Sequence, residues 1–284
     1  MKLVDLHVHT VYSDGSFTPK EAVQYAKKVN LSAIGITDHD ITGGIPDAIE
    51  EGKNQGVEVI PGVELSAEAG NNKELELHIL GYYINWEDEQ FQKTLLDFRL
   101  ARVERAHTIL KKLAKLNVYL KEDIIFQKGE NWSIGRLHFA KAMLKQGYIK
   151  DIPEAFKKYL GYNQPAYVPK FRLKADEAIK MILRVGGIPV LAHPVIGGYH
   201  NKAIMNDLVG FGLKGIEVWH SKHTPAVTEE FTQIANKSNL LVTGGSDCHG
   251  EMVDGTVMMG RIKVPYSVVE NLKICKEDIA KNLK

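Results

Sequence analysis

The hydrophobic residues of this chain gather in short runs separated by polar segments. Seven runs of four to six residues lack the polar and apolar alternation of a sheet with one face in water. We therefore expect strands that are buried on both faces, as in a parallel α/β sheet. The predicted strands are 3–6, 33–37, 57–62, 75–80, 188–192, 215–218 and 241–244.

Helical patterns separate most of these strands. Thr18, Pro19 and Glu21 combine a capping box with proline at the first helical position, and apolar residues follow at helical spacing. Thr224 and Pro225 open a second helix in the same way. Repeated strand and helix units in a chain of this length indicate a barrel or a doubly wound sheet. Seven strands favour the first of these, so we predict an α/β fold with a distorted (β/α)7 barrel.

The alternation stops between residues 86 and 165. A long amphipathic helix is predicted from Phe91 to Leu116, and shorter helical patterns follow at 136–146 and 152–160. Eighty residues without a strand pattern are too many for a loop, so we expect an inserted helical domain with its own core. The predicted division is barrel 1–85, helical insertion 86–165 and barrel 166–284.

Charge is distributed unevenly between these parts. The insertion holds 15 Lys and Arg against 10 Asp and Glu, a formal charge of +5, which leaves the rest of the chain at −4. Either the insertion is a solvated helical surface, or it is a lid whose positive field attracts an anionic substrate. The total charge of only +1 argues against stable binding to duplex nucleic acid.

Composition narrows the class of protein further. The chain has 284 residues, of which 44% are hydrophobic and 25% are charged, as in ordinary globular proteins. Its apolar runs are too short to span a membrane, and its first residues do not resemble a signal peptide, so we expect a cytoplasmic protein without a membrane partner. Two cysteines, Cys248 and Cys275, without C-x-x-C spacing exclude a disulfide framework and a cysteine-rich zinc site.

Histidines and acids follow the predicted strands. His7 and His9 end the first strand, and side chains at i and i+2 point to the same side of an extended segment. Alone, this pair is equally compatible with ordinary polar residues at a strand end. Further histidines and acids recur in or shortly after the later strands. Parallel α/β folds bind their ligands at the carboxyl ends of their strands. These further histidines and acids are Asp38, His39, Asp40, Glu64, His78, His193, Asp247 and His249. Asp14 either bends back toward them or is a turn residue before Gly15.

Imidazole and carboxylate ligands without thiolate suit Mn²⁺, Fe²⁺ or Zn²⁺. The nine candidate ligands are His7, His9, Asp14, His39, Glu64, His78, His193, Asp247 and His249. They exceed the needs of one ion, so we expect two or three divalent transition-metal ions with Glu64 as the bridge. Cys248 alternates with two of these ligands and is expected to point away and pack in the core.

The ordered motifs resemble those of the PHP family, the polymerase and histidinol phosphatase phosphoesterases. The motifs are His7-Val8-His9-Thr10, Tyr12-Ser13-Asp14-Gly15, Thr37-Asp38-His39-Asp40, Pro61-Gly62-Val63-Glu64, Leu77-His78, Ala192-His193-Pro194 and Gly245-Ser246-Asp247-Cys248-His249. The resemblance implies a seven-stranded barrel with three ions: one on His7, His9, Glu64 and Asp247, one on Glu64, His78 and His193, and one on Asp14, His39 and His249. Within this set we interpret Glu64, His193 and Asp247 as the catalytic residues.

The insertion resembles more narrowly the stand-alone bacterial PHP phosphoesterases that act on nucleotides. The matching segments are 132–140 and 165–170. The resemblance implies action on 3′,5′-nucleoside bisphosphates or on short 5′-phosphorylated RNA. Arg136 and Lys170 are candidate phosphate contacts, or else an ordinary helix-surface arginine and loop lysine. We also include His138 and His223 among the candidate substrate contacts. For one of His220 and His223, support of a metal ligand or contact with a phosphate is as compatible with the sequence as plain surface exposure.

The chemistry expected of such a site is hydrolysis of a phosphate ester by a metal-bound hydroxide. The sequence contains neither the G-x-S-x-G nucleophile pattern nor a P-loop. Three alternatives remain: a metal-dependent amidohydrolase, a histidinol-phosphate phosphatase, and a module whose metal site is structural. The oligomeric state is not predicted.

Overall fold

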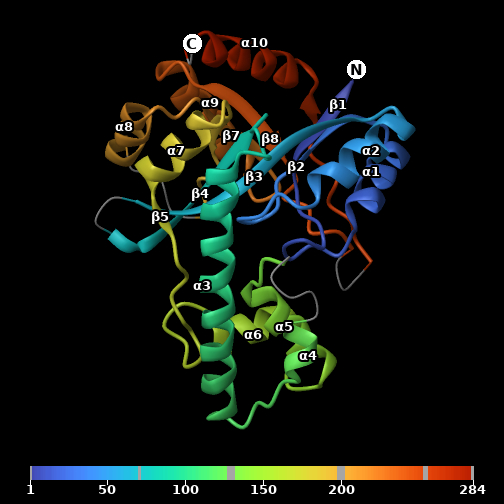
Figure 1. Cartoon of the computed structure of the whole chain (residues 1–284), viewed down its shortest axis with the longest axis vertical. Coiled ribbons are helices and arrows are strands. Elements are labelled where there is room, and N and C mark those ends of the chain that lie inside the picture. The colour runs from blue at the N-terminus through green and yellow to red at the C-terminus, as the bar shows by residue number, and fades with distance from the viewer. Residues whose placement is uncertain (1, 70–71, 127–131, 197–201, 252–254, 283–284) are drawn as a thin grey trace. The chain divides into compact units, whose positions relative to one another are not determined.

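The computed structural model describes residues 2–69, 72–126, 132–196, 202–251 and 255–282 (Figure 1). Its described part forms one nine-stranded sheet in the order β8-β7-β6-β4-β3-β2-β1-β9, with β5 paired to β3. The strands are β1 (Leu3–Val8), β2 (Leu31–Ile36), β3 (Glu58–Ala69), β4 (Asn72–Tyr82), β5 (Leu173–Lys174), β6 (Ile188–Leu191), β7 (Gly215–His220), β8 (Leu241–Gly245) and β9 (Val264–Pro265).

The seven longer strands are the seven that the sequence predicts, and they form a nearly closed barrel. The barrel closes between β1 and β8, where Val8, the last residue of β1, forms a parallel bridge with Cys248, which follows β8. His9 N–H donates to Cys248 O at 2.9 Å, and Cys248 N–H donates to His7 O at 3.1 Å. The predicted distorted (β/α)7 barrel is confirmed.

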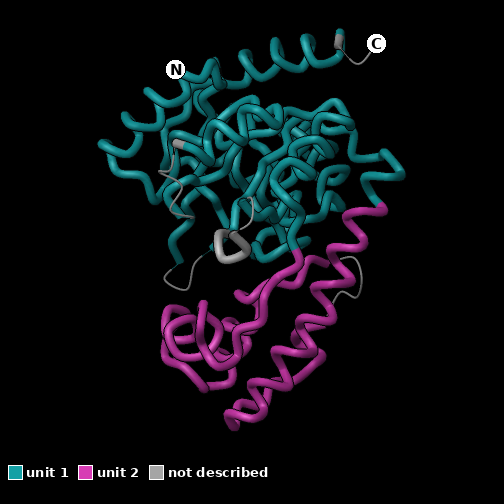
Figure 2. The backbone as a smooth tube through the Cα atoms, turned by 90° about the vertical axis from the view of Figure 1, so that its left-hand side faces the viewer, with its two compact units in different colours: residues 1–92, 172–284 teal, residues 93–171 magenta. Residues whose placement is uncertain are grey.

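Two compact units make up the chain, residues 1–92 with 172–284 and residues 93–171 (Figure 2). The sequence interpretation placed the insertion at 86–165, so both boundaries of the second unit fall later in the chain. Unit 1 contains the barrel and the helices α1 (Pro19–Lys28), α2 (Ile45–Gln55), α7 (Ala175–Arg184), α8 (Lys202–Phe211), α9 (Pro225–Lys237) and α10 (Ser267–Asn282). No helix in the described residues is long and apolar enough to cross a membrane.

The helix starts of unit 1 follow their sequence motifs. Glu21 N–H donates to Thr18 Oγ1 at 3.2 Å, and Thr18 N–H donates back to Glu21 Oε2 at 2.7 Å. This reciprocal pair satisfies two main-chain donors at the start of α1, which would otherwise lack partners. Thr224 caps α9 by accepting from Val227 N–H. Both predicted caps are confirmed.

Unit 2 is helical, as its hydrophobic pattern predicts. Most of α3 (Glu89–Ala114) lies in this unit, followed by α4 (Glu122–Ile125), α5 (Arg136–Lys145), α6 (Ile152–Ala155) and the π-helical turn η2 (Phe156–Leu160). Leu113, Phe139 and Leu160 are at most 1% exposed and belong to one buried cluster. The unit therefore has a hydrophobic core of its own.

The expectation of an all-parallel sheet is wrong at β4. This strand runs antiparallel to both β3 and β6. Only residues 70 and 71 separate β3 from β4, and a parallel crossover needs a dozen or more residues. His78 still lies at the carboxyl rim, because it comes just before the residues of β4 that pair with β6, which run from Ile79 to Tyr82. Ala192 N–H, just after β6, donates to His78 O at 3.0 Å.

The same hairpin changes the position of Glu64. The sequence places this residue at the end of the third strand, whereas β3 continues to Ala69. Pairing with β4 satisfies the main chain beyond the expected end, with Glu64 opposite Leu80 and Ser66 opposite His78. Glu64 therefore stands on rigid, doubly paired backbone and is fully buried.

A glycine allows β1 and β8 to approach each other beneath the site. A Cβ atom at Gly245 would lie 2.4 Å from the Cβ of His7 and 2.5 Å from its main-chain nitrogen. Gly210, near the end of α8, is exposed, and a Cβ atom there would meet nothing within 4 Å.

Gly245→Ala should lower the free energy of unfolding by about 1–3 kcal/mol, because the added methyl group overlaps a strand that cannot move without opening the barrel. Gly210→Ala is the matched control and should raise stability by about 0.5 kcal/mol, because alanine loses less backbone entropy in a helix. Urea unfolding of the two variants and the parent measures both effects. Equal stability of Gly245→Ala and the parent would contradict the close approach.

Candidate metal centre

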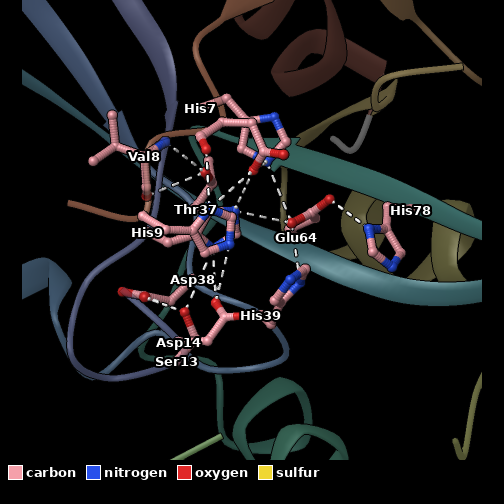
Figure 3. A network of polar contacts seen from close by, with 12 residues as sticks. His7, Val8, His9, Ser13, Asp14, Thr37, Asp38, His39, Glu64 and His78 are labelled. Atoms are coloured by element: carbon pink, nitrogen blue, oxygen red, sulfur yellow. Dashed lines mark hydrogen bonds and ion pairs between the residues drawn. The ribbon is translucent and has the colours of Figure 1, made fainter. Parts of the chain in front are cut away.

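The buried carboxylate of Glu64 lies at the centre of the histidine cluster (Figure 3). Its Oε1 lies 2.7 Å from His78 Nδ1 and 2.8 Å from His193 Nε2. Its Oε2 lies 3.0 Å from His39 Nδ1 and 3.2 Å from His9 Nε2. Each oxygen thus faces a different group of imidazoles, which is the geometry that a bridging carboxylate needs.

All nine side chains that the sequence selected come together at this rim. Their ligand atoms form four groups in which every atom lies within 4.8 Å of the others. The groups are His9, Asp14, His39 and His249; His7, Glu64 and His193; His7, His9 and Asp247; and His39, Glu64 and His78. The partition differs in part from the one that the PHP resemblance implies, because His7 groups with His193 and His39 groups with His78.

Several imidazoles are oriented by buried acceptors behind them. Glu217 is fully buried on β7, where its Oε1 accepts from His7 Nδ1 at 3.0 Å. The other oxygen of Glu217 accepts from the main-chain N–H of His193 at 2.8 Å. One carboxylate therefore fixes a ligand from β1 and the loop after β6 at the same time. Such an acceptor holds the ring and leaves the lone pair of His7 Nε2 facing the centre.

His9 and His78 have comparable partners. Ser13 donates its hydroxyl to Asp38 Oδ1 at 2.6 Å and lies 3.4 Å from His9 Nδ1. His78 Nε2 lies 3.1 Å from Glu76 Oε1. Asp38 belongs to a candidate ligand motif in the sequence. In the structure it lies outside the four ligand groups and accepts the hydrogen bond of Ser13 beside His9.

Two of the expected ligands sit on strained backbone. His193 has φ +25° and Asp247 has φ +55°, in a region that side chains with a Cβ rarely adopt. Such strain persists only where surrounding bonds hold it, and it gathers at functional sites. The bond from His193 N–H to Glu217 is one such restraint.

The charges in the cluster hold the carboxyl groups ionised. Burial tends to raise the pKa of Glu64, but the imidazoles of His39, His78 and His7 outweigh it and hold that pKa well below its usual value. The pKa of Asp247 is also held well below its usual value: burial opposes this, and His7 is the largest favourable influence. The site therefore keeps negative oxygens at neutral pH.

The pKa values of His9 and His39 are shifted in opposite directions. Burial tends to lower the pKa of His9, but Asp247 and Glu64 raise it to about 10. Burial lowers the pKa of His39 to about 4, against the influence of Glu64 and Asp14. With no cation present, protons on imidazoles such as His9 balance the carboxylates.

Divalent cations fit this donor set. His7 Nε2, His39 Nδ1 and Glu64 Oε2 are buried, and within the described residues they meet no hydrogen-bond partner of normal geometry. Asp247 Oδ1 lies 3.5 Å from His7 Nε2 and 3.1 Å from His9 Nε2. Buried polar atoms without partners are costly, and cations would satisfy them together. Imidazole and carboxylate donors suit Zn²⁺, Mn²⁺ or Fe²⁺.

The sequence interpretation missed Glu217. A single acid inside the apolar strand Gly215-Ile216-Glu217-Val218 was an available sign, because a buried carboxylate needs a charged or hydrogen-bonding partner. For His220 the sequence left support of a ligand, contact with a phosphate and surface exposure open, and the structure buries it. Its side chain is fully buried, and its Nε2 lies 3.5 Å from Asp247 Oδ2.

The expected substrate residues of unit 2 have structural partners there. Arg136 lies over the rings of Phe156 and Tyr167, at 5.7 and 5.6 Å, and donates to Leu160 O at 3.3 Å. These contacts restrain the guanidinium group. His138 Nδ1 accepts from Gly135 N–H at 2.9 Å and so caps α5. Lys170 is half-buried and lies inside unit 2, although the sequence placed it just beyond the insertion.

The remaining sequence expectations concern unit 1. His223 Nδ1 donates to Val218 O at 2.8 Å, and its Nε2 is buried. Cys248 is fully buried, and burial raises the pKa of its thiol to about 11. Its Sγ accepts from Gly250 N–H at 3.3 Å, outside the four ligand groups. The expected packing role of Cys248 is confirmed.

A nearly closed barrel that gathers imidazoles and carboxylates at its carboxyl rim defines a class of metal-dependent hydrolases. Residues 5–162 match the PHP domain, and the chain belongs to the PHP family.

Named relatives of this chain act on nucleotides and RNA. A 3′,5′-nucleoside bisphosphate phosphatase of Chromobacterium violaceum is 30% identical over 253 residues, which cover 88% of each chain. The 5′-3′ exoribonuclease Rnm of Escherichia coli is 30% identical over 255 residues, covering 87% of this chain and 85% of that one. A solved structure from Bifidobacterium adolescentis, described as a metal-dependent phosphoesterase, is 28% identical with a TM-score of 0.87 and covers 97% of this chain and 96% of that one.

Replacing Glu217 tests the buried framework of the site without any metal. Glu217→Ala should lower the free energy of unfolding by about 3 kcal/mol, because it leaves the N–H groups of His7 and His193 buried without an acceptor. Urea unfolding with a chelator present measures the loss. Glu50→Ala is the control: its exposed pair with Lys20 should contribute almost nothing. Equal stabilities of the two variants would contradict the anchoring role of Glu217.

Proposed function

We propose that the protein is a metal-dependent phosphoesterase that hydrolyses phosphate esters of nucleotides. The observation that carries the proposal is Glu64, whose two oxygens face separate groups of imidazoles at the rim of the barrel. A carboxylate in this position is suited to bridge two cations. The nine ligands would then be His7, His9, Asp14, His39, Glu64, His78, His193, Asp247 and His249, holding two or three ions of Mn²⁺, Fe²⁺ or Zn²⁺.

Such ions, when bound, would lower the pKa of a water molecule and neutralise charge on the phosphoryl group. The residues of this chain supply the rest. Glu217 holds the ring of His7 and the backbone of His193, so that the ligands do not have to reorganise when substrate binds. Glu64, His193 and Asp247 are the proposed catalytic residues. The burial of Glu64 keeps bulk water from its carboxylate.

A nucleotide substrate is supported by the two named relatives, which act on nucleoside bisphosphates and on RNA from the 5′ end. The candidate contacts are Arg136, His138, Lys170 and His223. Arg136 is the strongest of them, because stacking on two aromatic rings orients a guanidinium that can grip a phosphate with two N–H groups. Histidinol phosphate remains the competing substrate, and a structural metal site the competing function.

The direct test is phosphate release by protein that has been stripped of metal and reloaded with Mn²⁺. A 3′,5′-bisphosphonucleotide should be hydrolysed at least about tenfold faster, by kcat/KM, than histidinol phosphate or p-nitrophenyl phosphate. Glu64→Gln should fold normally and lose several orders of magnitude in activity, because the neutral amide cannot balance two cations.

Three results would contradict the proposal. Preference for histidinol phosphate would change the substrate class. Bound metal without turnover of any ester would indicate a structural site. One equivalent of metal or less in reloaded protein, measured by elemental analysis, would exclude a multinuclear centre.

Arg136→Ala tests the second anion-binding group. The variant should lose about 1.5–3 kcal/mol of transition-state stabilisation on a bisphosphonucleotide, the usual value for a hydrogen bond to a charged group. It should retain nearly full activity on p-nitrophenyl phosphate, which has no second anionic group and serves as the internal control. Equal losses on both esters would place Arg136 at the reacting phosphoryl group or in the fold, and no loss on either would leave it a structural residue of unit 2.

A further inference from the structure

His220 presents an N–H group toward the metal centre. The main-chain N–H of Lys222 donates to His220 Nδ1 at 3.1 Å, so this nitrogen must carry a lone pair. A neutral imidazole that accepts at Nδ1 has its proton on Nε2, and an imidazolium could not accept there at all. The backbone of the loop after β7 therefore makes His220 Nε2 a hydrogen-bond donor.

Three neighbouring ligand histidines have a hydrogen-bond acceptor behind the ring, whereas His220 has a donor there. Behind His7 and His78 the remote ring nitrogen meets a carboxylate oxygen, and behind His249 it meets a main-chain carbonyl at 2.9 Å. These partners only accept, so each of the three rings, in its neutral form, carries its proton on the far side and directs a lone pair at the centre. A lone pair binds a cation and an N–H group does not. His220 is thus unsuited to be a further metal ligand.

The donor of His220 is buried beside the centre. Its ring centroid lies 5.5 Å from that of His193, and its side chain is fully buried. Asp247 Oδ2 lies 3.5 Å from Nε2, which is longer than a normal hydrogen bond, and Nε2 has no partner of normal geometry within the described residues. A buried donor without a partner is costly unless a ligand supplies the acceptor.

We propose that His220 Nε2–H donates a hydrogen bond to a phosphoryl oxygen of the substrate beside Asp247, which makes His220 a catalytic residue. The inference rests on the proposed phosphoesterase function. A phosphate ester brings negatively charged acceptor oxygens to a site whose own carboxylates would face the cations. A fixed neutral donor at that point gains strength as charge develops on the phosphoryl group, and it needs no reorganisation.

Two variants of matched size separate the donor from the ring. His220→Phe keeps a ring of similar size without a donor, and His220→Gln replaces the ring by an amide whose N–H extends to a similar distance. Both are reloaded with Mn²⁺, and thermal unfolding establishes that they fold. Elemental analysis gives their metal content, calorimetry gives their affinity for inorganic phosphate, and kinetics give kcat/KM on a 3′,5′-bisphosphonucleotide.

We expect both variants to retain the metal content of the parent. His220→Phe should bind inorganic phosphate at least about tenfold more weakly and lose at least as much in kcat/KM, whereas His220→Gln should stay within about threefold of the parent. Loss of metal from His220→Phe would overturn the proposal, because it would show that His220 positions Asp247. Unchanged phosphate affinity and kcat/KM in His220→Phe would overturn it as well.

The parent protein distinguishes this inference from the function on which it rests. A reloaded parent that neither binds phosphate nor hydrolyses an ester refutes the phosphoesterase proposal itself. An active parent whose His220→Phe variant is equally active refutes only the role of His220.

Discussion

Burial of the Glu64 carboxylate is the constraint on which the rest of the rim depends. A buried anion is stable only when opposite charges and donors surround it. Here the surrounding groups are imidazoles, which come from β1, from β4 and from the loops after β2 and β6. Bringing these segments together requires the barrel to close, and the Val8–Cys248 bridge joins its two ends directly beside His7 and His9. Closure of the barrel is therefore what brings the imidazoles around Glu64.

The candidate ligands could be predicted from the sequence because their residue types are unusual and their positions regular. His7 and His9 differ by the strand period, His193 directly follows an apolar run, and Asp247 comes three residues after another. The direction of β4 could not be read in this way, since a buried strand has the same apolar pattern whether it runs parallel or antiparallel. The short link after β3 was the available sign. β3 continues seven residues beyond its predicted end at residue 62, and five beyond Glu64, to make the pairing.

The residues that orient the ligands or contact the substrate were harder to predict than the ligands themselves. Glu217 interrupts an apolar strand, and one acid in such a run does not reveal which side chain it will face. Which ring nitrogen of His220 carries the proton depends on the main-chain N–H of Lys222, and the loop geometry alone brings that group to the ring. Unit 2 shows the same limit: the pattern predicts its helices, while the stacking of Arg136 on Phe156 and Tyr167 appears only in three dimensions.

The two named relatives share the same identity with this chain yet carry different activities, a phosphatase and an exoribonuclease. A ligand set of imidazoles and carboxylates serves either reaction, because both break a bond to phosphorus with the same electrostatic needs. Discrimination must then come from groups that meet the substrate rather than the cations. In the roles proposed above, the group behind each ring makes this difference. The carboxylate behind His7 turns a lone pair of that ring toward the cations, and the main-chain donor behind His220 turns an N–H group toward the substrate.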